Sequence, residues 1–123
     1  MISVIIPIFN EEDNIKQLAE SILKVLKGLE FEVLFINDGS KDSSEEKILA
    51  LTQKHSEIKL ITLRRNYGQT AAMQAGFDYS TGDIIIPMDG DLQNDPKDIP
   101  MLIKKINEGY DVVSGWRKIR SDK

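Results

Sequence analysis

The stretch that decides the fold covers residues 2–36 and reads ISVIIPIFNEEDNIKQLAESILKVLKGLEFEVLFI. It begins with the β-branched run Ile2–Ile6, which predicts a strand. Apolar residues then recur at helical spacing from Ile15 to Leu26, and Gly28 follows as a helix stop. The run Phe31–Ile36 predicts a second strand. A helix between two such strands is typical of a parallel strand–helix–strand unit.

The alternation of strand and helix patterns continues along the rest of the chain. Further strands are expected over Ile58–Leu63, Ile84–Met88 and Asp111–Ser114. Helices are expected from the capping box Ser43-Ser44-Glu45-Glu46 to about Lys54, over Gln69–Tyr79, and from Asp95-Pro96 as far as Gly109. The sequence therefore predicts an α/β fold, a Rossmann-like and mainly parallel sheet with helices on both faces.

The composition excludes several classes of function. The 123 residues carry 16 Lys and Arg against 20 Asp and Glu, a net charge of −4 that is unfavourable for wrapping nucleic acid. The absence of cysteine excludes disulfides, cysteine-ligated metals and thiol catalysis, and the single histidine, His55, argues against a Ser-His-Asp triad. No apolar run approaches the roughly 20 residues of a membrane span. We expect one soluble, cytoplasmic domain that binds no nucleic acid.

Chemically capable side chains cluster directly after the predicted strands. They occupy residues 7–12, 37–40, 64–68, 89–93 and 115–117. Open α/β sheets bind ligands outside the carboxyl ends of their strands, where the strand order reverses. With the strand order 3-2-1-4, the loops after the first, second and fourth strands would share one crevice. That crevice would be surrounded by Glu11, Asp38, Asp89 and Asp91.

The segment Asp89-Gly90-Asp91 carries the most chemistry. Its two carboxylates lie two residues apart, and the glycine allows a tight turn in which both can face one ion. Oxygen ligands, with Gln93 close by, suit Mg²⁺ or Mn²⁺ rather than zinc. The same triplet is also typical of a solvated turn, because Asp and Gly favour turns for local reasons. Its place after a buried strand is what points to a metal site.

The neighbouring polar residues have structural interpretations beside functional ones. Asp38 could bind a base or ribose, or simply form part of a strand-to-helix turn. Glu11 could complement a helix dipole and Asn10 could cap a helix. Gly68 and Gly76 would allow close packing of a helix on the sheet. No glycine-rich phosphate-binding motif is present, so a bound nucleotide would depend on a metal and on side chains.

Five motifs in order resemble one enzyme family, the large inverting glycosyltransferase family with the GT-A fold. They are Val4-Ile5-Ile6-Pro7-Ile8-Phe9-Asn10-Glu11, Asn37-Asp38-Gly39-Ser40, Arg65-Asn66-Tyr67-Gly68, Asp89-Gly90-Asp91-Leu92-Gln93 and Gly115-Trp116-Arg117. The family includes dolichyl-phosphate mannose synthases and bacterial polyprenyl-phosphate glycosyltransferases, and the third and fourth motifs look closest to the polyprenyl-phosphate branch.

The resemblance implies a role for each matching residue. It implies nucleotide binding by Pro7, Phe9, Asn10, Glu11, Asp38, Gly68, Asp89 and Gly90. It implies a Mg²⁺ or Mn²⁺ ion held by Asp89 and Asp91 with help from Gln93. Arg117 would lie near the donor diphosphate or the acceptor phosphate, and Asp89, Asp91 and Arg117 would form the catalytic set. Residues 1–116 would be the nucleotide-sugar-binding domain, and the basic tail 117–123 would begin a missing C-terminal acceptor region.

The implied reaction is inverting transfer of a sugar from a UDP- or GDP-sugar to a polyprenyl phosphate in cell wall biosynthesis. The full-length protein would work in the cytoplasm against the inner membrane, and 123 residues alone would have little or no activity. An exposed sheet edge would favour a homo-oligomer. The alternatives are a nucleotide-sugar-binding module without turnover, or transfer to a glycan hydroxyl in polysaccharide synthesis. A receiver-like signalling domain would need a phosphoacceptor Asp after the third strand, where Arg64 and Arg65 stand.

Overall fold

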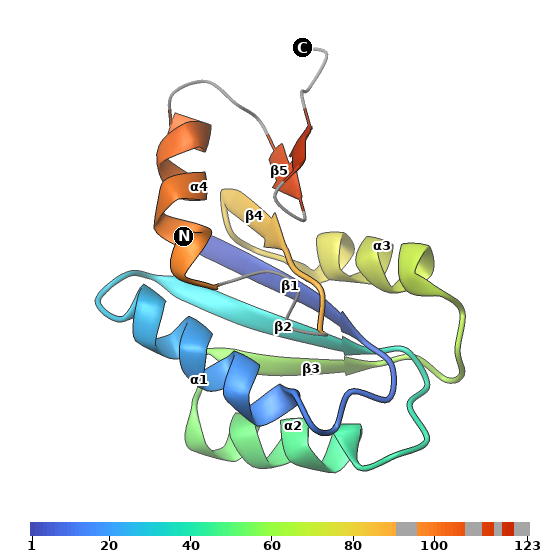
Figure 1. Ribbon diagram of the computed structural model, residues 1–123. Coiled ribbons are helices and arrows are strands. Elements are labelled where there is room, and N and C mark those ends of the chain that lie inside the picture. The colour runs from blue at the N-terminus through green and yellow to red at the C-terminus, as the bar shows by residue number, and fades with distance from the viewer. Residues whose placement is uncertain (91–95, 108–111, 115–116, 120–123) are drawn as a thin grey trace.

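A parallel sheet of four strands forms the centre of the structure (Figure 1). The computed structural model describes residues 1–90, 96–107, 112–114 and 117–119. The strands of this sheet are β1 (Ile2–Ile8), β2 (Phe31–Asn37), β3 (Ile58–Thr62) and β4 (Ile84–Pro87). The helices are α1 (Ile15–Leu26), α2 (Ser44–Lys54), α3 (Gln69–Tyr79) and α4 (Ile99–Asn107), the last preceded by the 3₁₀ turn η1 (Pro96–Asp98).

The strands lie in the order β3-β2-β1-β4, which is the order that brings the polar loops after the first, second and fourth strands to one crevice. β1 is central, and its Val4 pairs in register with Val33 of β2 on one side and Ile86 of β4 on the other. The chain adds β2 and β3 to one side of β1 and then crosses over to add β4 to the other side. The order therefore reverses between β1 and β4, which is where an open α/β sheet places its ligand crevice.

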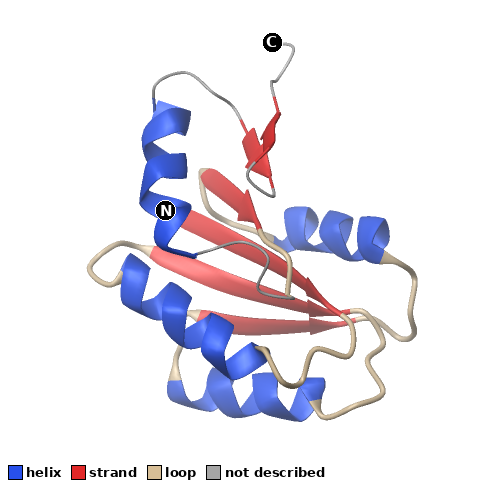
Figure 2. Cartoon of the chain, viewed as in Figure 1, coloured by secondary structure: helices blue, strands red, loops and turns tan. Residues whose placement is uncertain are grey.

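Different helices cover the two faces of the sheet (Figure 2), which confirms the predicted Rossmann-like arrangement. Val4 and Ile6 of β1 face a core built with α1, α2 and α4. Ile5 and its β2 neighbours face α3 on the opposite side. A Cβ atom on Gly76 of α3 would lie 3.0 Å from Ile5 Cβ and 3.0 Å from Ile36 Cδ1. The predicted close packing at Gly76 is thus confirmed.

The C-terminal strands differ from the prediction. The expected fifth strand is present as β5 (Val112–Ser114) and lies beside β4, but it pairs with β6 (Arg117–Ile119) in a separate antiparallel pair. The predicted basic tail 117–123 thus begins with a strand over residues 117–119, for which the sequence showed no signal. Ser114 pairs with Arg117, and so short a connection joins antiparallel strands only. The predicted helix signals Asp95 and Gly109 lie outside the described residues.

A buried carboxylate holds the amino-terminal edge of the sheet together. Glu32 at the start of β2 is 2% exposed. Its Oε2 accepts hydrogen bonds from Ser3 Oγ at 2.6 Å and from the backbone N–H of Thr81 at 2.8 Å, and its Oε1 accepts one from Lys59 Nζ at 2.8 Å. Burial alone would raise the pKa of Glu32, but these hydrogen bonds outweigh it and lower the pKa to about 2. The network ties β1, β2, β3 and the α3–β4 connection to one anion.

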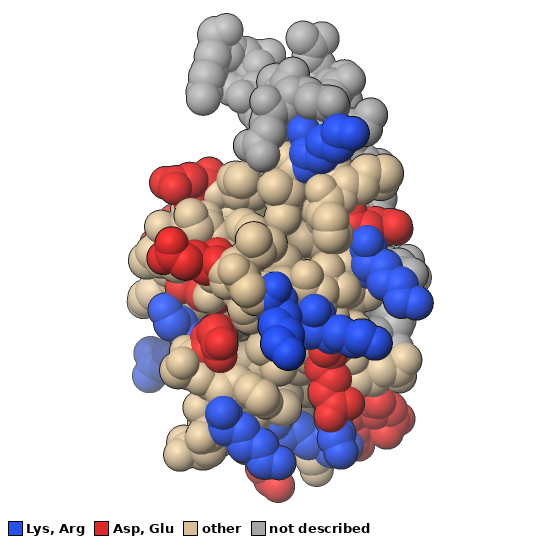
Figure 3. Space-filling view, turned by 90° about the vertical axis from the view of Figure 1, so that its left-hand side faces the viewer, with Lys and Arg blue, Asp and Glu red and all other residues tan. Residues whose placement is uncertain are grey.

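The surface seen in Figure 3 mixes charges of both signs. Acidic and basic side chains alternate over this end of the molecule, with no broad patch of one sign among the residues shown in colour. Within the described residues, no helix is both long enough and apolar enough to cross a membrane.

Candidate functional site

The loops that follow β1 and β2 are joined to each other by reciprocal hydrogen bonds. Asn10 adopts a left-handed backbone with a φ of 54°. Its N–H donates to Ser40 Oγ at 2.9 Å, and its Oδ1 accepts from the N–H of Lys41 at 2.8 Å. The N-cap of α1 is Asn14 rather than Asn10. The Asn10 side chain therefore bonds to the β2–α2 loop, and it is not among the residues that line the cleft described below.

The start of α2 is organised by Asp42, not by the predicted capping box. Ser43 occupies the N-cap but makes no side-chain capping bond, so that prediction is wrong. Asp42 Oδ1 instead accepts the N–H of Ser44 at 2.9 Å, and the buried Ser44 Oγ accepts the N–H of Glu11 at 3.0 Å. Burial acts to raise the pKa of Asp42, but its hydrogen bonds from Ser44 and Glu12 prevail and lower that pKa. The short side chains of this loop thus hold Glu11 at the end of β1.

Asp38 fixes the loop between β3 and α3. It is 3% exposed, and its N–H donates to the carbonyl of Ile8 at 2.8 Å. Its Oδ1 accepts the N–H of Tyr67 at 2.8 Å, and its Oδ2 accepts the N–H of Gly68 at 3.0 Å. Gly68 has a φ of +102° with open space where a side chain would stand, so its predicted role in helix packing is wrong. Asp38 thereby joins the carboxyl ends of β1 and β2 to the start of α3.

Asp89 lies at the end of β4, next to the buried Gly90. Gln69, the first residue of α3, donates from Nε2 to Asp89 Oδ1 at 3.1 Å. A Cβ atom on Gly90 would lie 3.2 Å from the carbonyl oxygen of Pro7 and 2.6 Å from Ile8 Cδ1. The missing side chain therefore lets the β4 loop approach β1 closely. Asp89 is brought to the same edge of the sheet as Asp38.

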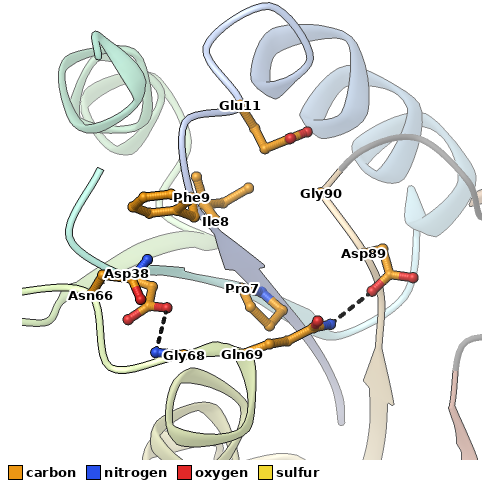
Figure 4. A pocket seen from close by; sticks show the side chains of 10 residues that line it. All are labelled: Pro7, Ile8, Phe9, Glu11, Asp38, Asn66, Gly68, Gln69, Asp89 and Gly90. Atoms are coloured by element: carbon orange, nitrogen blue, oxygen red, sulfur yellow. Dashed lines mark hydrogen bonds between the residues drawn. The ribbon is translucent and has the colours of Figure 1, made fainter. Parts of the chain in front are cut away.

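These side chains surround one cleft of about 280 Å³ at the carboxyl ends of β1, β2 and β4 (Figure 4). Seven residues predicted to bind the nucleotide line it: Pro7, Phe9, Glu11, Asp38, Gly68, Asp89 and Gly90. Ile8, Asn66 and Gln69 also line it, although the sequence predicted no site role for them. Only the motif position of Asn66 pointed to the loop, while Gln69 stood in a stretch typical of an ordinary helix. Phe9, one of these lining residues, is 43% exposed.

The metal prediction falls partly outside the described residues. Asp91 and Gln93 lie in the segment 91–95, and the side chain of Arg117 in β6 is likewise not described. Among the described residues, no group of three or more His, Cys, Asp and Glu side chains is arranged to hold a metal ion. Asp89 and Glu11 do line one cleft, and Mg²⁺ typically takes one or two protein carboxylates together with substrate phosphates. The oxygen donors present fit that mode of binding.

A second, larger hollow of about 530 Å³ adjoins the cleft and shares Phe9 and Asn66 with it. Its lining includes the basic residues Lys41, Arg64 and Arg65. The guanidinium carbon of Arg65 lies 5.1 Å from the ring centre of Tyr67, within the range of a cation–π contact. Positive charge is thus available beside the carboxylates of the cleft.

The sheet order and the carboxylate-lined cleft define a Rossmann-like α/β domain with the GT-A fold. The chain belongs to glycosyl transferase family 2, whose sequence model matches residues 3–123.

Three solved structures illustrate the similarity. The mannosyltransferase PcManGT from Pyrobaculum calidifontis, in complex with GDP-Man and Mn²⁺, has a TM-score of 0.77 at 19% identity, over 89% of this chain and 33% of that protein. Glucosyl-3-phosphoglycerate synthase from Mycobacterium tuberculosis, in complex with Mn²⁺, UDP and glucosyl-3-phosphoglycerate, has a TM-score of 0.71 at 25% identity, over 86% and 39%. S. aureus TarS 1–349 in complex with UDP has a TM-score of 0.70 at 22% identity, over 87% and 32%. The chain thus spans about a third of the length of these proteins.

Proposed function

We propose that the cleft binds the nucleoside diphosphate of a UDP- or GDP-sugar together with Mg²⁺ or Mn²⁺. The observation that carries the proposal is the convergence of Glu11, Asp38 and Asp89, from three different strands, on one cleft at the point where the strand order reverses. Membership of glycosyl transferase family 2 supports it. Proteins of the same fold crystallised with UDP, GDP-Man and Mn²⁺ support it further.

In this proposal the nucleoside lies along β1 and the diphosphate lies toward β4. Pro7 and the exposed face of Phe9 offer an apolar surface for the base and ribose. Asp38 holds the β3–α3 loop in place, and each of its oxygens retains a lone pair that can accept from a ligand. Gly90 keeps the β4 loop close to β1, so that Asp89 lies at the end of the cleft nearest the diphosphate.

The metal ion would be held by Asp89 and Asp91 with help from Gln93. When bound, it would act as a Lewis acid that offsets the negative charge developing on the leaving nucleoside diphosphate. Asp89 contributes a carboxylate already held in the cleft by Gln69. Arg117 is the proposed further cation near the donor diphosphate or the acceptor phosphate.

The proposed reaction of the whole protein is inverting transfer of the sugar to a polyprenyl phosphate. The motif Arg65-Asn66-Tyr67-Gly68 and the segment Asp89–Gln93 favour this branch of the family. A phosphate acceptor is an anion near neutral pH and needs no general base, whereas a sugar hydroxyl needs one. We propose that the reaction takes place at the cytoplasmic face of a membrane. Transfer to a glycan hydroxyl is the alternative acceptor chemistry.

Calorimetric titration of UDP and GDP into the chain, with and without Mn²⁺, tests the donor site. We expect metal-dependent binding of one nucleotide that is lost in Asp89→Asn. The exposed Asp13, close to the same loops, supplies the matched control Asp13→Asn, which should bind as the wild type does. A folded wild-type chain that binds neither nucleotide would contradict the proposed donor site.

Assays of the whole protein test the acceptor. Incubation with the nucleotide sugar and either a polyprenyl phosphate or an oligosaccharide should label the lipid phosphate, with the opposite anomeric configuration from the donor. Labelling of the oligosaccharide alone would refute the lipid acceptor, and retention of configuration would refute inversion. Binding without turnover on any acceptor would favour a nucleotide-sugar-binding module.

A further inference from the structure

Gln69 joins two parts of the cleft that are far apart in the sequence, the start of α3 and the loop after β4. It is the first residue of α3, and its amide Nε2 donates to Oδ1 of Asp89, after the end of β4, 3.1 Å away (Figure 4). Both side chains line the cleft. The bond therefore crosses the proposed diphosphate end of the site.

The backbone directly before Gln69 is held by a buried anion. The two carboxylate oxygens of Asp38 accept the N–H groups of Tyr67 and Gly68, the two residues that precede Gln69. The carbonyl of Gly68 accepts the N–H of Ala72 at 3.1 Å and so begins the helix. The backbone of Gln69 is consequently held by the Asp38 hydrogen bonds before it and by the first turn of α3 after it. Its side chain therefore extends from a fixed Cα position.

The chemistry of an amide suits the task of orienting an acid that binds a cation. A donor on Oδ1 restricts rotation of the Asp89 carboxylate about its Cβ–Cγ bond. Gln is neutral, so it orients the carboxylate without offsetting its charge, whereas Lys or Arg at the same place would compete with a divalent cation for it.

We propose that Gln69 is a positioning residue for Asp89, which it holds in the orientation needed to bind the divalent ion. Through Asp38 and the backbone of Tyr67 and Gly68, it connects the nucleoside end of the cleft with the metal end. The inference rests on the proposed function, because it assigns Asp89 to a metal ion.

Three variants of the chain separate positioning from a merely structural role. Gln69→Met keeps the length and helix preference of the side chain but removes the donor. Gln69→Lys keeps a donor and adds a positive charge. Thr70→Ala, at the next exposed position of the same helical turn, is the control. The affinity for Mn²⁺ alone is measured from the electron paramagnetic resonance signal of free Mn²⁺, and the urea midpoint of each variant is measured beside it.

We expect Gln69→Met to bind Mn²⁺ about tenfold more weakly than the wild type. Gln69→Lys should bind it more weakly still, and Thr70→Ala should match the wild type, with the urea midpoints of all variants unchanged. Wild-type affinity in Gln69→Met would overturn the inference and leave the proposed function standing. A loss of Mn²⁺ affinity that only follows a lower urea midpoint would overturn the inference as well. A folded wild-type chain that binds no Mn²⁺, even with UDP or GDP present, would overturn both.

A metal-free measurement tests the hydrogen bond itself. In a ¹⁵N-resolved NMR spectrum, the side-chain amide resonances of Gln69 should shift in Asp89→Asn and stay in place in Asp13→Asn. Unshifted Gln69 resonances in Asp89→Asn would overturn the inference whatever the metal affinity.

Discussion

Replacement of Glu32 by Gln should destabilise the chain without weakening its cleft. Glu32 is buried at the amino-terminal edge of the sheet, at the opposite end of β2 from Asp38. Gln has nearly the same shape but only one acceptor oxygen. Whichever way its amide turns, an N–H₂ group faces either Lys59 or the donors of Ser3 and Thr81. At least one charge-assisted hydrogen bond is therefore lost.

The size of the effect follows from the pKa of Glu32. Folding lowers this pKa from 4.5 to about 2, and each unit corresponds to about 1.4 kcal/mol. The charged form thus contributes about 3 kcal/mol to the free energy of unfolding at neutral pH. Because the folded pKa lies below the unfolded one, the contribution is complete above the unfolded value. It is lost as the pH falls through the folded value, and about half of it should remain near pH 3.

Urea denaturation followed by circular dichroism measures this contribution. We expect Glu32→Gln to be about 3 kcal/mol less stable than the wild type near pH 7, and the difference to narrow to about 1.5 kcal/mol near pH 3. Glu30→Gln, at an exposed neighbouring position, should change stability by less than about 0.5 kcal/mol at either pH. A Glu32→Gln difference that is the same at both pH values would refute the assignment of the stabilisation to the charge of Glu32.

Three further changes test the packing around the site. Gly39 has a φ of +73°, and a Cβ atom added there would collide with the backbone N of Asn66. Gly39→Ala should therefore lower the free energy of unfolding, measured in urea, by more than about 1 kcal/mol. An unchanged urea midpoint would count against such a collision. Gly76→Val should lower the free energy of unfolding by about 1–3 kcal/mol, because the larger side chain overpacks α3 on the sheet. Thermal unfolding measures this effect, and a stabilised variant would show that the helix can move away. Asp42→Asn should cost about 1 kcal/mol near pH 7, since its carboxylate accepts the N–H of Ser44. Because the pKa of Asp42 is lowered on folding, that difference should begin to shrink as the pH falls below the ordinary value of 3.8 and should disappear below the folded value. A pH-independent difference would show that the charge of Asp42 is not its cause.

The architecture of the sheet was accessible from the sequence because its signals are local. The apolar runs and helical spacings within residues 2–36 depend on neighbours a few positions apart, and they correctly marked β1, α1 and β2. The small side chain of Gly76 within a helix pattern likewise indicated close packing. The rule that polar residues at the carboxyl ends of parallel strands meet at one edge then placed Glu11, Asp38 and Asp89 around the same cleft.

Two local features of the sequence did not reveal the contacts that form, the cap of α2 and the pairing of residues 117–119. The Ser43–Glu46 pattern satisfied the capping rule, yet Ser43 at the N-cap makes no side-chain capping bond, and Asp42 accepts the N–H of Ser44. Residues 117–119, at the start of the predicted basic tail, carried no strand signal, yet they pair with β5 as β6. Strand pairing depends on the partner strand, here β5, and the sequence of residues 117–119 alone does not encode it.

The sequence by itself determined the α/β fold and the place of the polar residues at the carboxyl ends of the strands, and the structure supplied the strand order. Only the tertiary structure decided which of those residues touch. Asp38 bonds to Tyr67 and Gly68, about 30 positions later, and Gln69 reaches Asp89 across 20 positions. Each contact depends on the direction of a side chain and on the path of a loop over a sheet already folded. A pattern along the chain records periodicity and composition, and it contains neither of these quantities.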